Sequence, residues 1–297
     1  MDEIKQKSFE QPAKVFLWEA LLFLVTLLLG VLNGYRVSQT IDFDIVKAGQ
    51  VDLLHLAVYF VVGTAILVAL SSSSFKKTRG VIFKVLFLLA VGTGGLLLLQ
   101  FWLPPQGSLL IILGLLILWG FLHSVVIHDL LVILGIAGAG SWLGLSFTPQ
   151  LVVVLLLIFS AYDFIAVYKT KHMVKMARAM IQADSIVGLI IPARIKDFTK
   201  DIREVYPGGK FLIVGGGDVV FPLILCVSFV PVSMIKALIM VGFSLLGLAF
   251  SFWVFATQKI KKPIPALPPI TAGVVMGYLV VMLIENVPRE GLEPSSP

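Results

Sequence analysis

The sequence contains few charged residues and almost no cysteine. Of its 297 residues, 13% are charged and 58% are hydrophobic. Soluble globular chains average about 25% charged residues, so this composition excludes a water-soluble globule. The single cysteine, Cys226, excludes a disulfide within the chain. What the sequence has instead is a series of long apolar runs, which predict an all-α, polytopic membrane protein.

The chain is basic, with a formal net charge of +6. A basic protein can bind nucleic acid, but here the lysines and arginines fall in short blocks between apolar runs. This distribution is typical of the loops of membrane proteins. We therefore expect contact with a lipid bilayer and no nucleic-acid partner.

No cleavable signal peptide is evident at the N-terminus. The first apolar run, residues 15–32, is longer than the core of a signal peptide and has no small-x-small cleavage pattern after it. We interpret this run as the first membrane span. Glu19 lies inside it, one turn from the polar flank, where we expect its side chain to reach the membrane interface.

Apolar runs of about 20 residues recur along the chain and predict about nine membrane spans. The expected spans cover residues 15–32, 51–70, 81–103, 108–126, 129–147, 150–168, 211–230, 233–256 and 264–284. We expect a single membrane domain over residues 1–297, with six spans in 1–168, a loop at 169–210, three spans in 211–284 and a tail at 285–297.

The basic residues also predict the orientation of the chain. A cytoplasmic N-terminus and an external C-terminus place all 23 lysines and arginines on the cytoplasmic side except Arg36, Lys47, Lys236 and Arg289. The loop 169–210 is then cytoplasmic. We expect it to contain a short interfacial helix near 173–181 or to be a mobile, solvated linker.

Four polar residues lie at the junction of the fourth and fifth expected spans: His123, Ser124, His128 and Asp129. Histidine and aspartate are metal-ligand types, but a short polar turn at the membrane interface accounts for these residues more simply. We therefore predict no metal site, and we expect no cofactor.

Two aspartates lie inside apolar runs. Asp163 is in the sixth expected span, and Asp218 follows three glycines in the seventh. A carboxylate at the centre of a bilayer costs about 2.5–3.5 kcal/mol, so it usually faces a polar cavity and a partner. At 1.5 Å per residue the two lie about 8 Å and about 10 Å from the same membrane face. Since consecutive antiparallel spans are commonly neighbours, we expect the carboxylates to face each other.

Two facing carboxylates favour acid–base chemistry. They cannot both ionise easily, so they share a proton, as in aspartic proteases. The ionised carboxylate can then activate a water molecule, while its protonated partner polarises a peptide carbonyl. Four prolines between residues 263 and 269 indicate broken backbone beside a cavity at the start of the ninth span.

Each of these features also has another explanation. A buried aspartate can bond two helices together, three glycines can allow close helix packing, and a proline cluster can cap a helix. Their occurrence at one depth favours a common site. Paired aspartates and a broken helix also suit a proton- or cation-coupled transporter or channel, and this alternative stays open.

Three motifs resemble signatures of the presenilin and signal peptide peptidase family of intramembrane aspartyl proteases. They are Tyr162-Asp163, Gly215-x-Gly217-Asp218 and Pro265-Ala266-Leu267-Pro268, which are similar to the YD, GxGD and PALP motifs. The resemblance implies that Asp163 and Asp218 are the catalytic residues of an aspartic endopeptidase. It implies a substrate-binding role for Tyr162, Gly215, Gly216, Gly217, Pro265, Ala266, Leu267 and Pro268.

The resemblance also implies partners and a location. The size of the chain is similar to that of a microbial homologue, which implies a prokaryotic plasma membrane, single-span transmembrane substrates and no obligatory accessory subunit; a homo-oligomer stays open. The expected orientation resembles presenilin, not signal peptide peptidase, whose orientation is inverted. Gly216 stands where presenilins commonly have leucine, and the loop 169–210 is shorter than presenilin's. Substrate specificity and self-cleavage are therefore not carried over.

Overall fold

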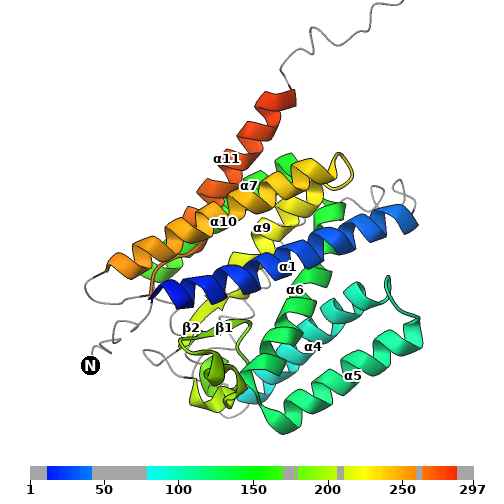
Figure 1. The fold of residues 1–297 in the computed structure, drawn as a ribbon, viewed down its shortest axis with the longest axis vertical. Coiled ribbons are helices and arrows are strands. Elements are labelled where there is room, and N and C mark those ends of the chain that lie inside the picture. Colours follow the sequence, from blue (N-terminus) through cyan, green and yellow to red (C-terminus); the bar gives the residue numbers. More distant parts are fainter. Residues whose placement is uncertain are drawn as a thin grey trace, which may run out of the picture.

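The computed structural model describes residues 12–41, 79–169, 177, 180–205, 211–258 and 263–285. The chain is mostly helical (Figure 1), which confirms the expected fold class. The α-helices are α1 (Pro12–Thr40), α4 (Arg79–Leu99), α5 (Pro105–Leu122), α6 (Val125–Ser146), α7 (Pro149–Phe164), α9 (Gly216–Ser228), α10 (Met234–Thr257) and α11 (Leu267–Glu285). The other elements are the π-helix η2 (Ile165–Lys169), the 3-10 helices η3 (Ile195–Thr199) and η4 (Ile202–Glu204), and the strands β1 (Gly188–Pro192) and β2 (Phe211–Gly215).

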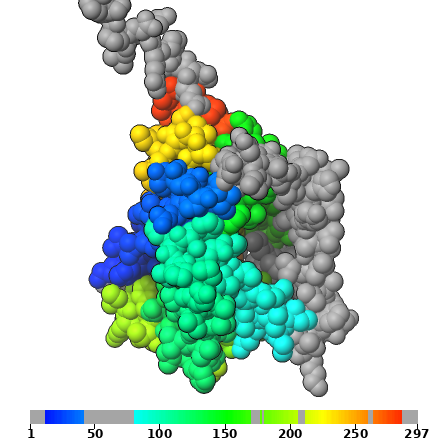
Figure 2. Space-filling model, turned by 90° about the vertical axis from the view of Figure 1, so that its right-hand side faces the viewer, coloured from blue at the N-terminus to red at the C-terminus, as the bar shows by residue number. Residues whose placement is uncertain are grey.

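The outer surface of the helices is apolar. Seven helices in the described residues are long and apolar enough to cross a membrane. On α5, which forms a ridge on the face shown in Figure 2, Leu110 and Phe121 are 70% and 81% exposed. Such a large exposed apolar surface requires lipid around it. The protein is therefore a multi-pass integral membrane protein.

Most of the expected spans correspond to helices. The first expected span matches α1. The third to sixth match α4, α5, α6 and α7 with η2, and the last two match α10 and α11. The second expected span, 51–70, lies outside the described residues. The seventh, 211–230, was partly wrong, because its first five residues form β2 and its helix begins only at Gly216.

Strand β2 exists because it has a partner in the expected loop. β1 and β2 pair antiparallel, with Gly188 opposite Gly215 and Pro192 opposite Phe211. All five residues of β1 are buried. The expectation of a solvated linker was therefore wrong for residues 180–205. The expected interfacial helix near 173–181 lies largely outside the described residues.

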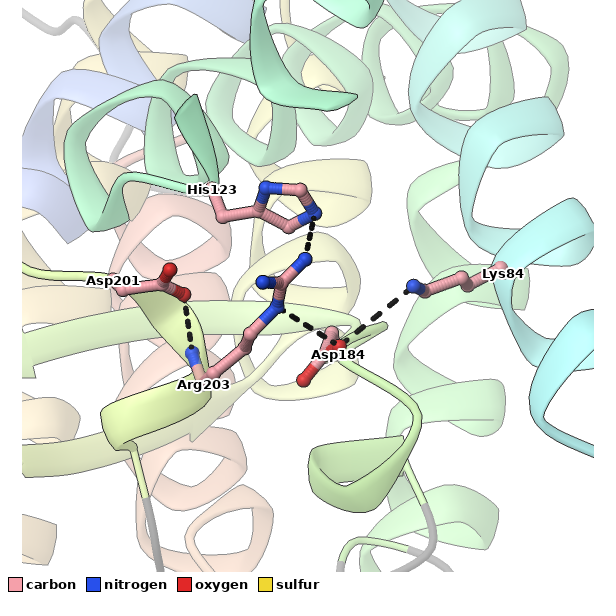
Figure 3. A network of polar contacts seen from close by, with 5 residues as sticks. All are labelled: Lys84, His123, Asp184, Asp201 and Arg203. Carbon is pink, nitrogen blue, oxygen red and sulfur yellow. Dashed lines mark hydrogen bonds and ion pairs between the residues drawn. The ribbon is translucent and has the colours of Figure 1, made fainter. Parts of the chain in front are cut away.

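Polar contacts hold this segment against the ends of two helices (Figure 3). The Arg203 guanidinium lies 2.7 Å from His123 Nε2, at the end of α5. Arg203 Nε and Lys84 Nζ on α4 each lie 3.7 Å from Asp184 Oδ2. A backbone hydrogen bond adds to these contacts, because Ile202 N–H donates to the carbonyl oxygen of His123 at 2.7 Å. Residues 180–205 are thus a packed part of the fold.

Helix α9 is largely buried and packs against α6, α1 and α10 (Figure 1). Leu223 fits against glycines of both neighbours, and so does Val227, one turn later. A Cβ added to any of these glycines would lie 2.5–2.8 Å from an α9 side chain; they are Gly30, Gly34, Gly140 and Gly144. Small residues four apart allow helices to approach closely in membranes.

The same contacts fix the direction of the helices. Gly30 and Gly34 meet Leu223 and Val227 in the same order along the chain, so α1 and α9 run parallel. The pair Gly140 and Gly144 gives the same result for α6. Parallel first, fifth and seventh spans agree with an alternating nine-span topology. Which end faces the cytoplasm stays a prediction.

Candidate active site

Asp218 lies in the first turn of α9, where an extended strand turns into a helix. The turn is fixed by a hydrogen bond from Gly216 N–H to the carbonyl of Val187 at 2.9 Å. Gly215 is the N-cap of α9, so Asp218 is the third residue inside the helix. An acidic side chain at this position can reach back to the N-cap backbone, and the Asp218 carboxylate does bond to Gly215. The N-terminus of α9 thereby supplies a backbone hydrogen bond to the carboxylate.

The glycines before Asp218 leave space for its carboxylate. A Cβ added to Gly215 would lie 3.1 Å from Asp218 Oδ2, closer than ordinary van der Waals contact. Gly215 has φ −61°, so any residue could adopt its backbone conformation. By contrast, a Cβ on Gly217 would meet the Phe221 ring at an ordinary 3.6 Å. Space beside the carboxylate is the physical reason for glycine at 215.

Asp163 lies in the last turn of α7 and is 4% exposed. Its Oδ2 accepts a hydrogen bond from Leu267 N–H at 3.3 Å. Leu267 is the first residue of α11, where backbone N–H groups have no partner within the helix. Asp163 therefore caps the start of α11. Immediately after Phe164 the helix widens into the π-helix η2, a feature that is frequent at functional sites.

The proline-rich stretch is broken backbone only in its first half. Residues 263–265 are not helical, as expected from their prolines. Pro268 and Pro269 lie in the first turn of α11, so the expectation that they also interrupt a helix was wrong. Proline is tolerated there because the first N–H groups of a helix need no internal partner. Pro265 and Leu267 are buried, and Ala266 and Pro268 are partly buried.

The ends of α7 and α9 come together. The rings of Phe159 and Phe221 stack with their centroids 4.3 Å apart. Phe159 lies one turn before Asp163 and Phe221 lies one turn after Asp218, so this stack places the two carboxylates at the same level. Their charges interact. The structure thus brings Asp163, Asp218 and Leu267 to one place, beside Gly215–Gly217 and the Pro265–Pro268 stretch.

Glu19 does not reach the membrane interface, so that expectation was wrong. It is 7% exposed on α1, its Oε2 has no hydrogen-bond partner within the described residues, and its charge interacts with that of Asp218. Glu19 shares a buried stripe with Val15 and Phe23, which are spaced four residues apart. The run around Glu19 is apolar on every face, so the sequence does not distinguish this stripe from the others.

The other candidate residues divide into two groups. His123 lies at the end of α5 and contacts Arg203, as expected for a polar turn. His128 and Asp129 are buried in α6, so the same expectation was wrong for them. They bond to the backbone of β1 instead. Tyr162 is 36% exposed on α7, beside Asp163.

Comparisons with known proteins give a family match and similar solved structures. A family model described as signal-peptide peptidase, presenilin aspartyl protease matches residues 22–287. A search of curated proteins gives no match. A solved structure of a presenilin family intramembrane aspartate protease in space group P2 is 24% identical, with a TM-score of 0.59 over 89% of this chain and 96% of that one.

A second such structure, in space group C222, is 23% identical, with a TM-score of 0.57 over 91% of this chain and 99% of that one. At these identities the likeness to solved structures shows a shared fold. The family model shows more than the fold, because it matches residues 22–287, which is most of the chain and the range in which both aspartates lie. The chain belongs to the signal-peptide peptidase and presenilin family of aspartyl proteases.

Proposed function

We propose that the protein is a GxGD-type intramembrane protease, which hydrolyses peptide bonds in transmembrane helices with Asp163 and Asp218 as its catalytic pair. The observation that supports this proposal is the position of Asp163 and Asp218 at the ends of α7 and α9, each one turn from the Phe159–Phe221 stack. Family membership supports the same chemistry.

The proposed reaction needs one proton between the two carboxylates. The ionised aspartate removes a proton from a water molecule as its oxygen attacks the scissile carbonyl, and the protonated aspartate donates to the carbonyl oxygen. Collapse of the tetrahedral intermediate breaks the C–N bond, and the amine leaves with a proton from the pair. The hydrogen bond from Leu267 N–H to Asp163 Oδ2 leaves the other oxygen of Asp163 for this chemistry.

The substrate backbone has to be exposed before water can attack it. In a transmembrane helix every backbone group is bonded internally, so the helix must unwind locally. We propose that the unwound strand docks between residues 215–217 and 265–268, with Tyr162 at the edge of the site. β1 covers one edge of β2, and within the described residues no strand covers the other. A substrate strand added there would lead directly to Asp218.

The partners follow from this mode of binding. We propose single-span transmembrane proteins or peptides as substrates, in the lipid bilayer of a prokaryotic plasma membrane, with a cytoplasmic N-terminus and an external C-terminus. No cofactor and no obligatory accessory subunit enters the mechanism. A homo-oligomer is compatible with it.

A cleavage assay tests the proposal. The purified protein in detergent should cut a single-span peptide, and both Asp163→Ala and Asp218→Ala should abolish cleavage. The same preparations in liposomes separate the alternative, because a transporter or channel would conduct protons or cations. Ion flux that depends on both aspartates, without any cleavage, would replace the protease with that alternative.

A further inference from the structure

His128 and Asp129 take no part in the proposed chemistry, yet they are 0% and 3% exposed in α6. Asp129 Oδ1 accepts a hydrogen bond from Ile190 N–H at 2.8 Å. His128 Nε2 lies 3.3 Å from the carbonyl oxygen of Gly188, so this nitrogen carries the proton and donates it. The His128 ring also stacks on Phe87, with centroids 5.1 Å apart and planes 3° from parallel.

These two bonds fall on one edge of β1. In an antiparallel pair, successive residues direct their N–H and C=O groups alternately toward the partner strand and away from it. Val187 accepts a bond from Gly216, on the side of β2, so Gly188 and Ile190 direct their groups mainly to the opposite side. The side chains of α6 therefore bond to two of the backbone groups on the edge of β1 that faces away from β2.

We propose that His128 and Asp129 are positioning residues, which cover the outer edge of β1 as a third strand would, and so hold the hairpin that carries Asp218. This role rests on the proposed function of Asp218. The connection from α6 to Asp218 has few steps. Asp129 and His128 bond to β1. β1 pairs with β2, where Gly188 lies opposite Gly215, and Gly216 N–H bonds to Val187. Asp218 follows two residues later.

The proposal also explains which strand edge is left for a substrate. An unpaired edge presents a row of free N–H and C=O groups that can accept another strand. His128 and Asp129 close this row on β1, so the free edge of the hairpin is the one on β2, nearer to Asp218. The pair thereby selects the edge that leads an added strand to the catalytic aspartates.

The choice of residues supports a specific role. A buried carboxylate is costly in a membrane helix, and Asp129 Oδ2 has no hydrogen-bond partner within the described residues. An apolar side chain would fill the same space without this cost, but it could not accept the Ile190 N–H. The bond to β1 is therefore what the carboxyl group adds at this position.

Two substitutions at one position test the hydrogen bond. Asp129→Asn keeps an acceptor for Ile190 N–H, whereas Asp129→Leu keeps the branched shape of the side chain and has no acceptor. Ser141→Ala on the same helix is the matched control, because it removes another buried polar contact, the 2.7 Å bond from Asn33, far from β1 along α6.

We call the bond between Asp129 and Ile190 N–H the tether of β1. Hydrogen exchange measures this tether and does not require an active enzyme. In an Asp163→Asn background, Asp129→Leu should speed exchange of the Ile190 amide and of β2 by about five- to tenfold, the effect of losing one hydrogen bond. Asp129→Asn and Ser141→Ala should leave exchange in both strands unchanged. Unchanged exchange in Asp129→Leu, or equally fast exchange in Asp129→Asn, would overturn the tether.

Cleavage kinetics measure whether Asp129 helps to position Asp218. In the otherwise wild-type protein, Asp129→Leu should lower kcat by about tenfold to a hundredfold, because small displacements of a catalytic group have effects of this size. Asp129→Asn should restore most of kcat, and Ser141→Ala should leave it unchanged. Faster exchange with an unchanged kcat would overturn the positioning role alone. A wild type that cuts no peptide would instead remove the proposed function, and the exchange result would still decide the tether.

Discussion

The two ends of α9 have opposite characters. Its C-terminal half is apolar and buried, with Leu223 and Val227 packed against glycines of α1 and α6. Its N-terminal turn follows a strand and carries Asp218, which interacts with the charges of Asp163 and Glu19. The C-terminal half provides close packing, and the N-terminal half carries one ionisable group, Asp218.

The difference shows where a membrane protein can place polar groups. Asp163 lies in the last turn of α7, Asp218 in the first turn of α9, and Leu267 at the start of α11. Helix starts have free N–H groups, and these are the polar partners that a carboxylate can use inside a bilayer. The stack of Phe159 on Phe221, one turn away, keeps the ends of α7 and α9 in register.

The largest expected effect is at the N-terminal turn. Asp218→Asn, like Asp163→Asn, should lower the cleavage rate by about a thousandfold or more, because each removes one carboxylate of the pair. The melting temperature in detergent should not fall, since asparagine has the same shape and still accepts a hydrogen bond. A variant with more than about a tenth of the wild-type rate would contradict the catalytic assignment.

The opposite result is expected in the C-terminal half. A Cβ at Gly144 would lie 2.5 Å from Val227 Cβ and 2.8 Å from the carbonyl oxygen of Ile224. Gly144→Val should therefore destabilise the protein by about 1–3 kcal/mol and lower its melting temperature by several degrees. Cleavage per folded molecule should be retained.

Gly114→Val is the control for this substitution, because a Cβ at Gly114 on α5 has nothing within 4 Å. Its melting temperature should stay close to that of the wild type. Equal melting temperatures for the two valine variants would show that the glycine contacts of α9 contribute little to stability.

A smaller loss of activity is expected when the space beside Asp218 is filled. Gly215→Ala places a Cβ 3.1 Å from Asp218 Oδ2 and should lower kcat by about tenfold to a hundredfold through a displaced carboxylate. Gly217→Ala, whose Cβ meets its nearest neighbour at 3.6 Å, should have a smaller effect. The reverse order would mean that the glycines act through substrate contact and not through Asp218.

The smallest expected effect concerns pH. Wild-type activity should follow a bell-shaped profile, falling at low pH when the pair takes up a second proton and at high pH when it loses the shared one. Glu19→Gln removes a nearby group whose negative charge would oppose that loss. The alkaline limb should therefore move to lower pH, with little change in the maximal rate. An unchanged profile would show that Glu19 and the pair are uncoupled.

Several parts of the site could be predicted from the sequence. Asp163 and Asp218 stand out because aspartate is costly in an apolar run, and their similar distances from one membrane face predicted that they meet. Leu267 was identified by a motif, and its backbone does bond to Asp163. The functional roles of these residues stay predictions until they are tested.

Other parts were beyond the sequence. Glu19 was expected at the interface, and His128 and Asp129 were assigned to a polar turn, because a single residue in an apolar segment does not reveal what it faces. His128 and Asp129 bond to β1, which lies 60 and 61 residues away in the chain, and Glu19 is buried with its charge interacting with that of Asp218 on α9.

The sequence by itself determined which segments enter the membrane, because the free energy of transfer into lipid is a sum over neighbouring residues. It also determined that the fold is all-α and that the two aspartates lie at a similar depth from one membrane face. Only the tertiary structure decided that residues 211–215 form a strand, because an apolar run can satisfy its backbone in a helix or against a partner strand. That partner, β1, lies in a segment that hydropathy had assigned to a loop, and its pairing with β2 sets where α9 begins and so where Asp218 lies.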